Sequence, residues 1–161
     1  MGRVKSRPRK DAGFTLIEAV VGIALVAVAV LGLAQMFTLS VMNNLRSDRI
    51  TTAAFLAQQR LDSLRNLTLA ELTAFAQNGS VDLNGDSTPD LLNDELIDLN
   101  LDNHNDYRLI TQVTQPSAGT FNIQVMVFTP EQFKYARSEL VASPDTHRVR
   151  ANLSTVISRA F

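Results

Sequence analysis

Hydrophobic residues form one long uncharged run near the start of the chain and shorter periodic runs after it. No charged residue occurs from Ala19 to Leu45, and the apolar side chains are densest over Ala19–Ala34. A helix of about 20 apolar residues crosses a lipid bilayer. The pattern therefore predicts a membrane-spanning helix within residues 14–45.

A helical spacing of apolar residues continues beyond the uncharged run. Charged residues alternate with this stripe and predict an amphipathic helix over residues 46–67, with its apolar face on a sheet. The predicted face consists of Ile50, Ala53, Ala54, Ala57, Leu61, Leu64 and Leu67. No proline occurs from Phe14 to Asn66, so one helix can run through both segments. A second helical stretch, Leu69–Gln77, ends at Asn78-Gly79.

Runs near the C-terminus alternate in the manner of β-strands. They are Tyr107–Gln115, Thr120–Thr129 and Arg148–Ser158, and the turn-forming residues Pro116–Gly119 separate the first two. We expect Glu131–Thr146 to be an exposed loop. One long helix followed by an antiparallel sheet over residues 107–158 predicts an α+β fold.

The 161 residues carry a formal net charge of -1 that is unevenly distributed. Basic residues crowd the first thirteen positions, where Asp11 is the one acid; they are Arg3, Lys5, Arg7, Arg9 and Lys10. Basic residues beside a membrane span usually set its orientation, with the basic side in the cytoplasm, so we predict no direct binding of nucleic acid. The chain has no cysteine, which excludes disulfides, metal–thiolate sites and a lipoprotein anchor.

Glu18 lies near the start of the apolar segment. Its charge helps to decide between a signal peptide, a plain membrane anchor and other interpretations of that segment. A secretory signal peptide would be cut before Gln35, after the small-x-small site Gly32-Leu33-Ala34, but Glu18 lies inside its apolar region. A plain single-pass anchor leaves Glu18 unexplained, because a charge inside the membrane costs about 2.5–3.5 kcal/mol.

The sequence GFTLIE, from Gly13 to Glu18, resembles the processing motif of type IV prepilins and of type II secretion pseudopilins. The resemblance implies that residues 1–13 are a leader, which a prepilin peptidase removes by cutting between Gly13 and Phe14. It implies N-methylation of Phe14 and the pilin fold, a long N-terminal helix packed on a small antiparallel sheet. It also implies that Glu18 pairs with the new amine of Phe14 in a neighbouring subunit, since each charge alone is costly in a low dielectric. The alternative is an acid near the interface that reaches water.

The segment Ala53–Leu67 looks like the matching helix of PilV-type minor pilins and of the I-type minor pseudopilin. This resemblance implies a minor structural subunit of a type IV pilus; the alternative in the family is a type II secretion minor pseudopilin. Other pilins, the prepilin peptidase and the inner-membrane assembly platform are the implied partners. The chain would cross the inner membrane once, with its N-terminus in the cytoplasm and residues 46–161 in the periplasm, before entering a pilus at the cell surface.

Nothing in the sequence indicates an enzyme. It contains no phosphate-binding loop and no spacing of serine, histidine and acid that suggests a nucleophile. His104 and His147 lie in segments expected to be loops, and we interpret both as surface residues.

An acidic region, residues 78–106, contains an internal repeat. The sequences DLNGDSTPD from Asp82 and DLNLDNHND from Asp98 share oxygen side chains at positions 1, 3, 5 and 9, a spacing that wraps calcium. The first copy resembles EF-hand and dockerin loops, but Ser87 replaces the usual glycine and position 12 is Asn93 instead of an acid. The candidate ligands are Asp82, Asn84, Asp86 and Asp90, with Asp98, Asn100, Asp102 and Asp106 as a poorer second set.

Calcium is therefore the one candidate cofactor, and the alternative is a solvated acidic loop. A calcium-binding or adhesive module is the corresponding function of a different class. Apolar residues in this region are expected to attach it to the core; they are Leu91, Leu92, Leu96, Ile97 and Leu99.

Overall fold

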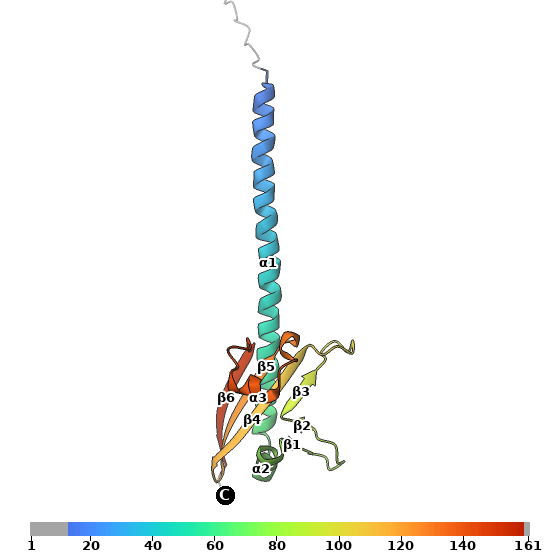
Figure 1. Cartoon of the computed structure of the whole chain (residues 1–161), viewed down its shortest axis with the longest axis vertical. Helices are drawn as coiled ribbons and strands as arrows, with labels where there is room; N and C mark the ends of the chain where they lie inside the picture. Colours follow the sequence, from blue (N-terminus) through green and yellow to red (C-terminus); the bar gives the residue numbers. More distant parts are fainter. Residues whose placement is uncertain (1–12, 160–161) are drawn as a thin grey trace, which may run out of the picture. The chain divides into compact units, whose positions relative to one another are not determined.

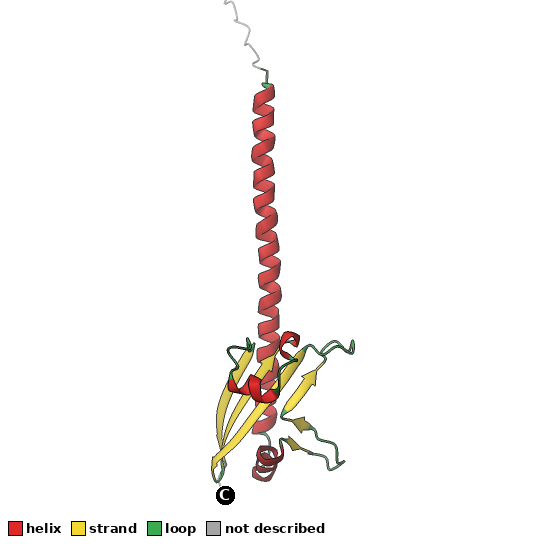
Figure 2. Cartoon of the chain, viewed as in Figure 1, coloured by secondary structure: helices red, strands yellow, loops and turns green. Residues whose placement is uncertain are grey.

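The computed structural model describes residues 13–159 and has the α+β architecture that the sequence predicts (Figures 1 and 2). The chain divides into two compact units between Leu45 and Arg46. Helix α1 (Leu16–Arg65) contributes residues to both units.

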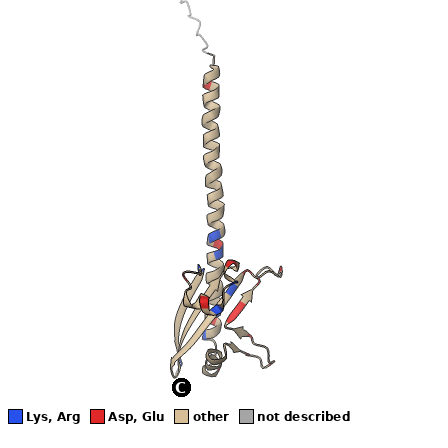
Figure 3. Cartoon of the chain, viewed as in Figure 1, with Lys and Arg blue, Asp and Glu red and all other residues tan. Residues whose placement is uncertain are grey.

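The first unit is the apolar part of α1. The hydroxyl of Thr15 accepts a hydrogen bond from the backbone N–H of Glu18 at 3.3 Å, which satisfies one donor at the start of the helix. All side chains from Gly13 to Leu45 are exposed, and none after Glu18 is charged (Figure 3). Within residues 13–159, α1 is the one helix with the length and apolar composition needed to cross a membrane.

The second unit contains a four-stranded antiparallel sheet in the order β3-β4-β5-β6. Its strands are β3 (Asp94–Ile97), β4 (Tyr107–Ser117), β5 (Thr120–Phe128) and β6 (Ala151–Ser158). The sequence pattern predicted the last three strands but missed β3. It also ended β4 too early, because the pairing shifts between Thr114 and Ser117, and such an irregularity tolerates a proline that donates no hydrogen bond.

One face of this sheet packs against the second half of α1. The core includes Ala53, Leu56, Ala57, Leu61 and Leu64 from the helix and Phe121, Ile123, Val125 and Val127 from β5. The predicted helix face was partly wrong, because Ile50 and Ala54 are exposed while Leu56 and Arg60 are buried. The buried face of α1 is therefore rotated slightly about the helix axis from the face predicted by the spacing of apolar residues.

Helix α2 (Leu69–Asn78) closes one end of the same core with Leu72 and Phe75. Thr68 and Glu71 form a capping box, in which each side chain accepts the other residue's backbone N–H. Gly79 ends the helix with a φ of 73°, in the left-handed region. A side chain there would also clash, because an added Cβ would lie 2.2 Å from Nδ2 of Asn93.

The segment Glu131–Thr146 covers one end of the other face of the sheet, so the expectation of an exposed loop there was only partly right. Many of its residues are exposed, but it contains helical elements and buries Leu140. The segment contains the 3-10 turn η1 (Pro130–Gln132) and helix α3 (Arg137–Ala142). Leu140 of α3 packs in a second cluster with Ile110, Met126 and Phe128. His147 is buried beside this cluster, against the ring of Tyr135 at 4.4 Å, and is not the surface residue expected.

The acidic region contains strands as well as loops. Strand β1 (Ser80–Val81) pairs with β2 (Leu91–Leu92), and β3 pairs with β4, so each copy of the repeat connects two antiparallel strands. Leu91 and Ile97 pack against the main core as expected. The expectation failed for Leu92, Leu96 and Leu99, which are exposed.

Candidate functional site

Gly13 and Phe14 lie immediately before α1, where the sequence places the cleavage site. Nothing lies within 4 Å of the position that a Cβ on Gly13 would occupy, and Phe14 is 79% exposed. Among residues 13–159, nothing therefore covers the peptide bond between them. The remainder of the predicted leader, residues 1–12, lies outside the described residues.

Glu18 lies in the first turn of α1, one helical turn beyond Phe14. Both residues line the same shallow apolar hollow on the helix surface, together with Gly22 and Leu25. Within residues 13–159, no cation lies within salt-bridge distance of the Glu18 carboxylate. The hollow thus brings together an aromatic residue just before α1, a carboxylate of its first turn and a glycine one turn further on.

The first acidic loop is closed by its own side-chain oxygens. Both oxygens of Asp82 accept backbone hydrogen bonds, from Gly85 at 2.7 Å and from Ser87 at 2.8 Å. The carboxylate of Asp90 accepts the backbone N–H of Leu83 at 2.7 Å. Ser87, which replaces the usual glycine, has a φ of 71°, in the region that glycine favours.

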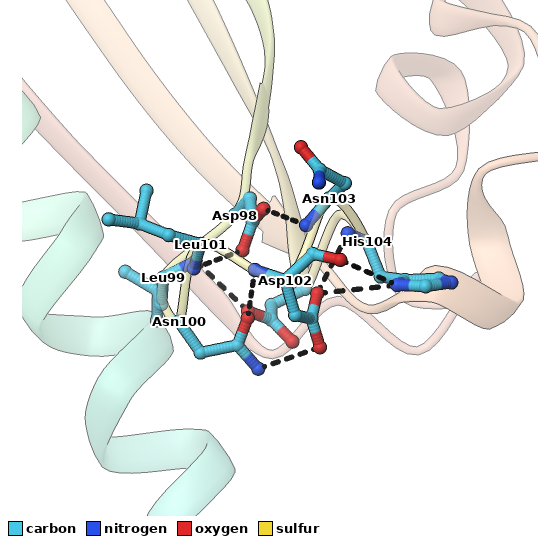
Figure 4. Close-up of polar contacts among 8 residues, drawn as sticks. Asp98, Leu99, Asn100, Leu101, Asp102, Asn103 and His104 are labelled. Carbon is cyan, nitrogen blue, oxygen red and sulfur yellow. Dashed lines mark hydrogen bonds and ion pairs between the residues drawn. The ribbon is translucent and has the colours of Figure 1, made fainter.

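The second loop repeats these contacts position by position (Figure 4). Asp98 accepts the backbone N–H groups of Leu101 and Asn103, each at 2.8 Å, and Asp106 accepts that of Leu99 at 3.0 Å. Asn103 has a φ of 65° and corresponds to Ser87. The sequence repeat is therefore a structural repeat as well.

Hydrogen bonds lower the pKa of acids in both loops. The backbone N–H of Gly85 makes the largest contribution for Asp82, the side chain of Thr88 for Asp86, and the backbone N–H of His104 for Asp102. These contacts favour the ionised carboxylates, so the loops hold concentrated negative charge at neutral pH.

Acid is expected to weaken both loops. A carboxyl with a lower pKa in the folded state stabilises that state above its unfolded pKa, and the contribution is lost as the pH falls through the folded value. Because the reference pKa is 3.8, nuclear magnetic resonance titration of the side-chain carboxyl carbons should give midpoints below 3.8 for Asp82, Asp86 and Asp102. Midpoints at or above that value would contradict the hydrogen-bonding pattern.

The donor set of the loops suits calcium in chemistry, because carboxylate and amide oxygens are its preferred ligands. The arrangement is a poorer match. Among the described residues, no three acidic or histidine side chains are gathered closely enough to hold a metal ion. The structure thus brings each predicted ligand set into one loop, and calcium binding stays a prediction.

Two ion pairs in the second unit were missed by the sequence analysis. Arg108 of β4 donates to both oxygens of Asp94, from Nε at 2.7 Å and from Nη2 at 2.6 Å, and to the backbone oxygen of Tyr135 at 2.8 Å. The contact with Asp94 raises the pKa of Arg108. Arg60, which lies outside the predicted apolar face of its helix, is buried and pairs with Glu95. An alternating pattern along β3 could have indicated that Asp94 and Glu95 lie on a strand, but a run of four residues is too short to predict one.

Comparison with known proteins identifies the N-terminal segment. The family described as the prokaryotic N-terminal methylation motif matches residues 8–34. The chain therefore carries the signature of type IV prepilins and pseudopilins, and its helix-on-sheet architecture matches the pilin fold. No curated protein and no solved structure matches the chain.

The signature marks a structural class of protein that is processed by prepilin peptidase and assembles with other pilins. It fits the apolar helix α1, whose exposed first half is suited to membrane anchoring. The molecule thus combines a prepilin-type motif, a helix suited to membrane anchoring and a folded second unit.

Proposed function

We propose that this protein is a minor structural subunit of a type IV pilus, with no enzymatic activity of its own. The observation that carries the proposal is the methylation motif at residues 8–34, which leads directly into an apolar helix with every side chain exposed up to Leu45. An apolar surface of this length is stable in a lipid bilayer or when packed against other helices. The core of a filament supplies such packing.

The proposed mechanism of assembly begins with cleavage between Gly13 and Phe14, which creates a new amine on Phe14. N-methylation leaves that amine positively charged. In the assembled filament, Glu18 of one subunit pairs with the Phe14 amine of its neighbour and fixes the axial position of the two helices. The apolar hollow supports this pairing, because Phe14 and Glu18 both line it.

Before assembly, the protein is held in the inner membrane by α1. The basic residues before Phe14 place the N-terminus in the cytoplasm and residues 46–161 in the periplasm. The partners of this route are the prepilin peptidase, the inner-membrane assembly platform and other pilins. The final location is the pilus at the cell surface.

Mass spectrometry of the native membrane or filament fraction tests the proposal. We expect the N-terminal peptide to start at Phe14 and to carry one added methyl group. A start at Gln35 would show ordinary secretion and would remove the filament function. An intact start at Met1 or Gly2 in cells that contain an active prepilin peptidase would identify a plain membrane anchor.

A type II secretion minor pseudopilin is the alternative within the same class. The resemblance of Ala53–Leu67 extends to both kinds of protein, and the methylation motif is common to them. Neighbouring genes distinguish them, since a retraction ATPase accompanies a pilus and secretion genes accompany a pseudopilus. A calcium-binding or adhesive module is the alternative of a different class, favoured by the repeated loop geometry and tested by calcium titration of the full-length protein.

A further inference from the structure

Strand β6 forms one edge of the four-stranded sheet, and only β5 pairs with it among residues 13–159 (Figure 1). Its eight residues, Ala151–Ser158, contain no charge and no proline. Proteins normally protect an edge of this length with lysine, proline, a bulge or a covering segment. Among the described residues, β6 shows none of these within its own length, and its sixth residue, Val156, is 65% exposed.

The backbone of β6 offers unused hydrogen-bonding groups at regular intervals. The N–H of Arg159 donates to the backbone oxygen of Gly119 at 2.7 Å, and Thr155 is paired with Ile123 in the continuous register. Because hydrogen-bonded and non-hydrogen-bonded pairs alternate in an antiparallel ladder, the N–H and C=O groups of Asn152, Ser154 and Val156 point away from β5. They form a row that an extended chain can pair with.

The opposite edge of the sheet is less suited to such pairing. Strand β3 is only four residues long and begins with Asp94 and Glu95. The second acidic loop follows it directly, whereas β2 and Asn93 separate it from the first acidic loop. Short length and charge are the usual protections of an edge strand, so β6 is the edge that remains open.

Basic residues lie at both ends of β6. Arg148 and Arg150 precede the strand and Arg159 follows it, and none of the three forms an ion pair within residues 13–159. The guanidinium of Arg159 donates to the neutral backbone oxygens of Arg65 and Leu67, which leaves its positive charge unpaired by an acid among these residues. A second copy of β6 in antiparallel register would place Arg150 of one chain near Arg159 of the other, and a parallel register would align identical arginines. Like charges therefore oppose self-pairing and favour a strand with carboxylates at its ends.

We propose that the free edge of β6 receives an extended strand from a different subunit of the assembly, uncharged along its centre and acidic at its ends. The added strand extends the sheet to five strands through backbone hydrogen bonds, and the flanking arginines select its charge. The proposal rests on the function as a filament subunit and adds a contact between folded units to the contacts between helices.

The substitution Ser154→Pro in the full-length chain tests the edge directly. The N–H of Ser154 points away from β5, so proline removes an outward donor and leaves the bonds to β5 in place. The matched control Ser154→Ala retains the N–H. Quantitative blotting of the filament fraction should show about a tenfold lower amount of Ser154→Pro than of Ser154→Ala, since one hydrogen bond is lost and its acceptor on the added strand is left unsatisfied.

A second pair of variants guards against misfolding by proline. Val156→Lys adds a charge to the edge strand, whereas Asn122→Lys adds the same charge to the paired position on the inner strand β5. Only Val156→Lys should lower filament incorporation, and salt should not restore it, because the lysine blocks the added strand itself. Equal incorporation of both lysine variants, or of both Ser154 variants, would overturn the proposal.

The same samples separate this proposal from the proposed function. Wild-type protein whose N-terminal peptide starts at Phe14, together with normal incorporation of Ser154→Pro, would refute the edge contact and leave the filament function intact. A wild-type peptide that does not start at Phe14 would refute the filament function. Because the chain has no native cysteine, Val156→Cys gives a further check: a disulfide-linked homodimer in the filament would show that a second copy occupies the edge and would refute a different subunit.

Discussion

Replacing Glu18 with glutamine is expected to lower the amount of this protein in filaments at least about tenfold, because loss of one partner from a desolvated charge pair costs about 2 kcal/mol or more. Glutamine keeps the size and polarity of the side chain but removes its charge. The amine of Phe14 in the neighbouring subunit would then remain unpaired in a low-dielectric filament core. Cleavage and membrane insertion should continue, so the protein should accumulate in the membrane.

The measurement is the ratio of filament to membrane protein, with mass spectrometry of the N-terminus on the same samples. Glu18→Asp, which retains the charge, should retain more incorporation than Glu18→Gln. Thr38→Val changes a polar side chain further along the same helix and should behave as wild type. If Glu18→Gln entered filaments normally, Glu18 would be an acid that merely reaches water near the membrane surface.

Replacing Asp94 with alanine is expected to destabilise the second unit by about 2–3 kcal/mol. The side chain of Arg108 is only 13% exposed, and Asp94 accepts two of its hydrogen bonds. Without the carboxylate, a mostly buried guanidinium retains the backbone oxygen of Tyr135 as its best acceptor. Urea denaturation of the full-length protein in detergent, followed by circular dichroism, should show a lower midpoint.

The control for this change is Asp62→Ala. Asp62 and Arg65 also form an ion pair, at 3.5 Å, but both side chains are at least half exposed. An exposed pair of this kind contributes about 0–1 kcal/mol, so the midpoint should move much less. Similar shifts for Asp94→Ala and Asp62→Ala would mean that water still solvates Arg108 when Asp94 is removed.

The processing motif was readable from the sequence because it is short and contiguous. Gly13, Phe14 and Glu18 lie within six residues, and the apolar run that follows is identified by composition alone. The family match to residues 8–34 confirms the signature. The cleavage itself and the role of Glu18 stay predictions, since both involve other molecules.

The acidic repeat was also readable because its motif is short and contiguous. The strand pair that each loop connects could not be predicted from the sequence. Equal spacing of aspartates indicated two similar loops, and the structure shows matching hydrogen bonds to Asp82 and Asp98. The sequence pattern did not show that each loop joins two antiparallel strands. Strands of two and four residues are too short for alternation to reveal them.

The sequence by itself determined the α+β class, the processing motif, the long helix and the three longest strands, because each follows from a local pattern of at least six residues. Only the tertiary structure decided which residues are buried where the pattern along one element does not settle it. Arg60 lies inside because Glu95 of β3 faces it, and Met126 and Phe128 are buried because α3 covers the second face of the sheet. The open edge of β6 belongs to the same category, since strand order is a property of the assembled sheet. Local patterns select elements, whereas contacts between distant residues decide which surfaces those elements leave exposed.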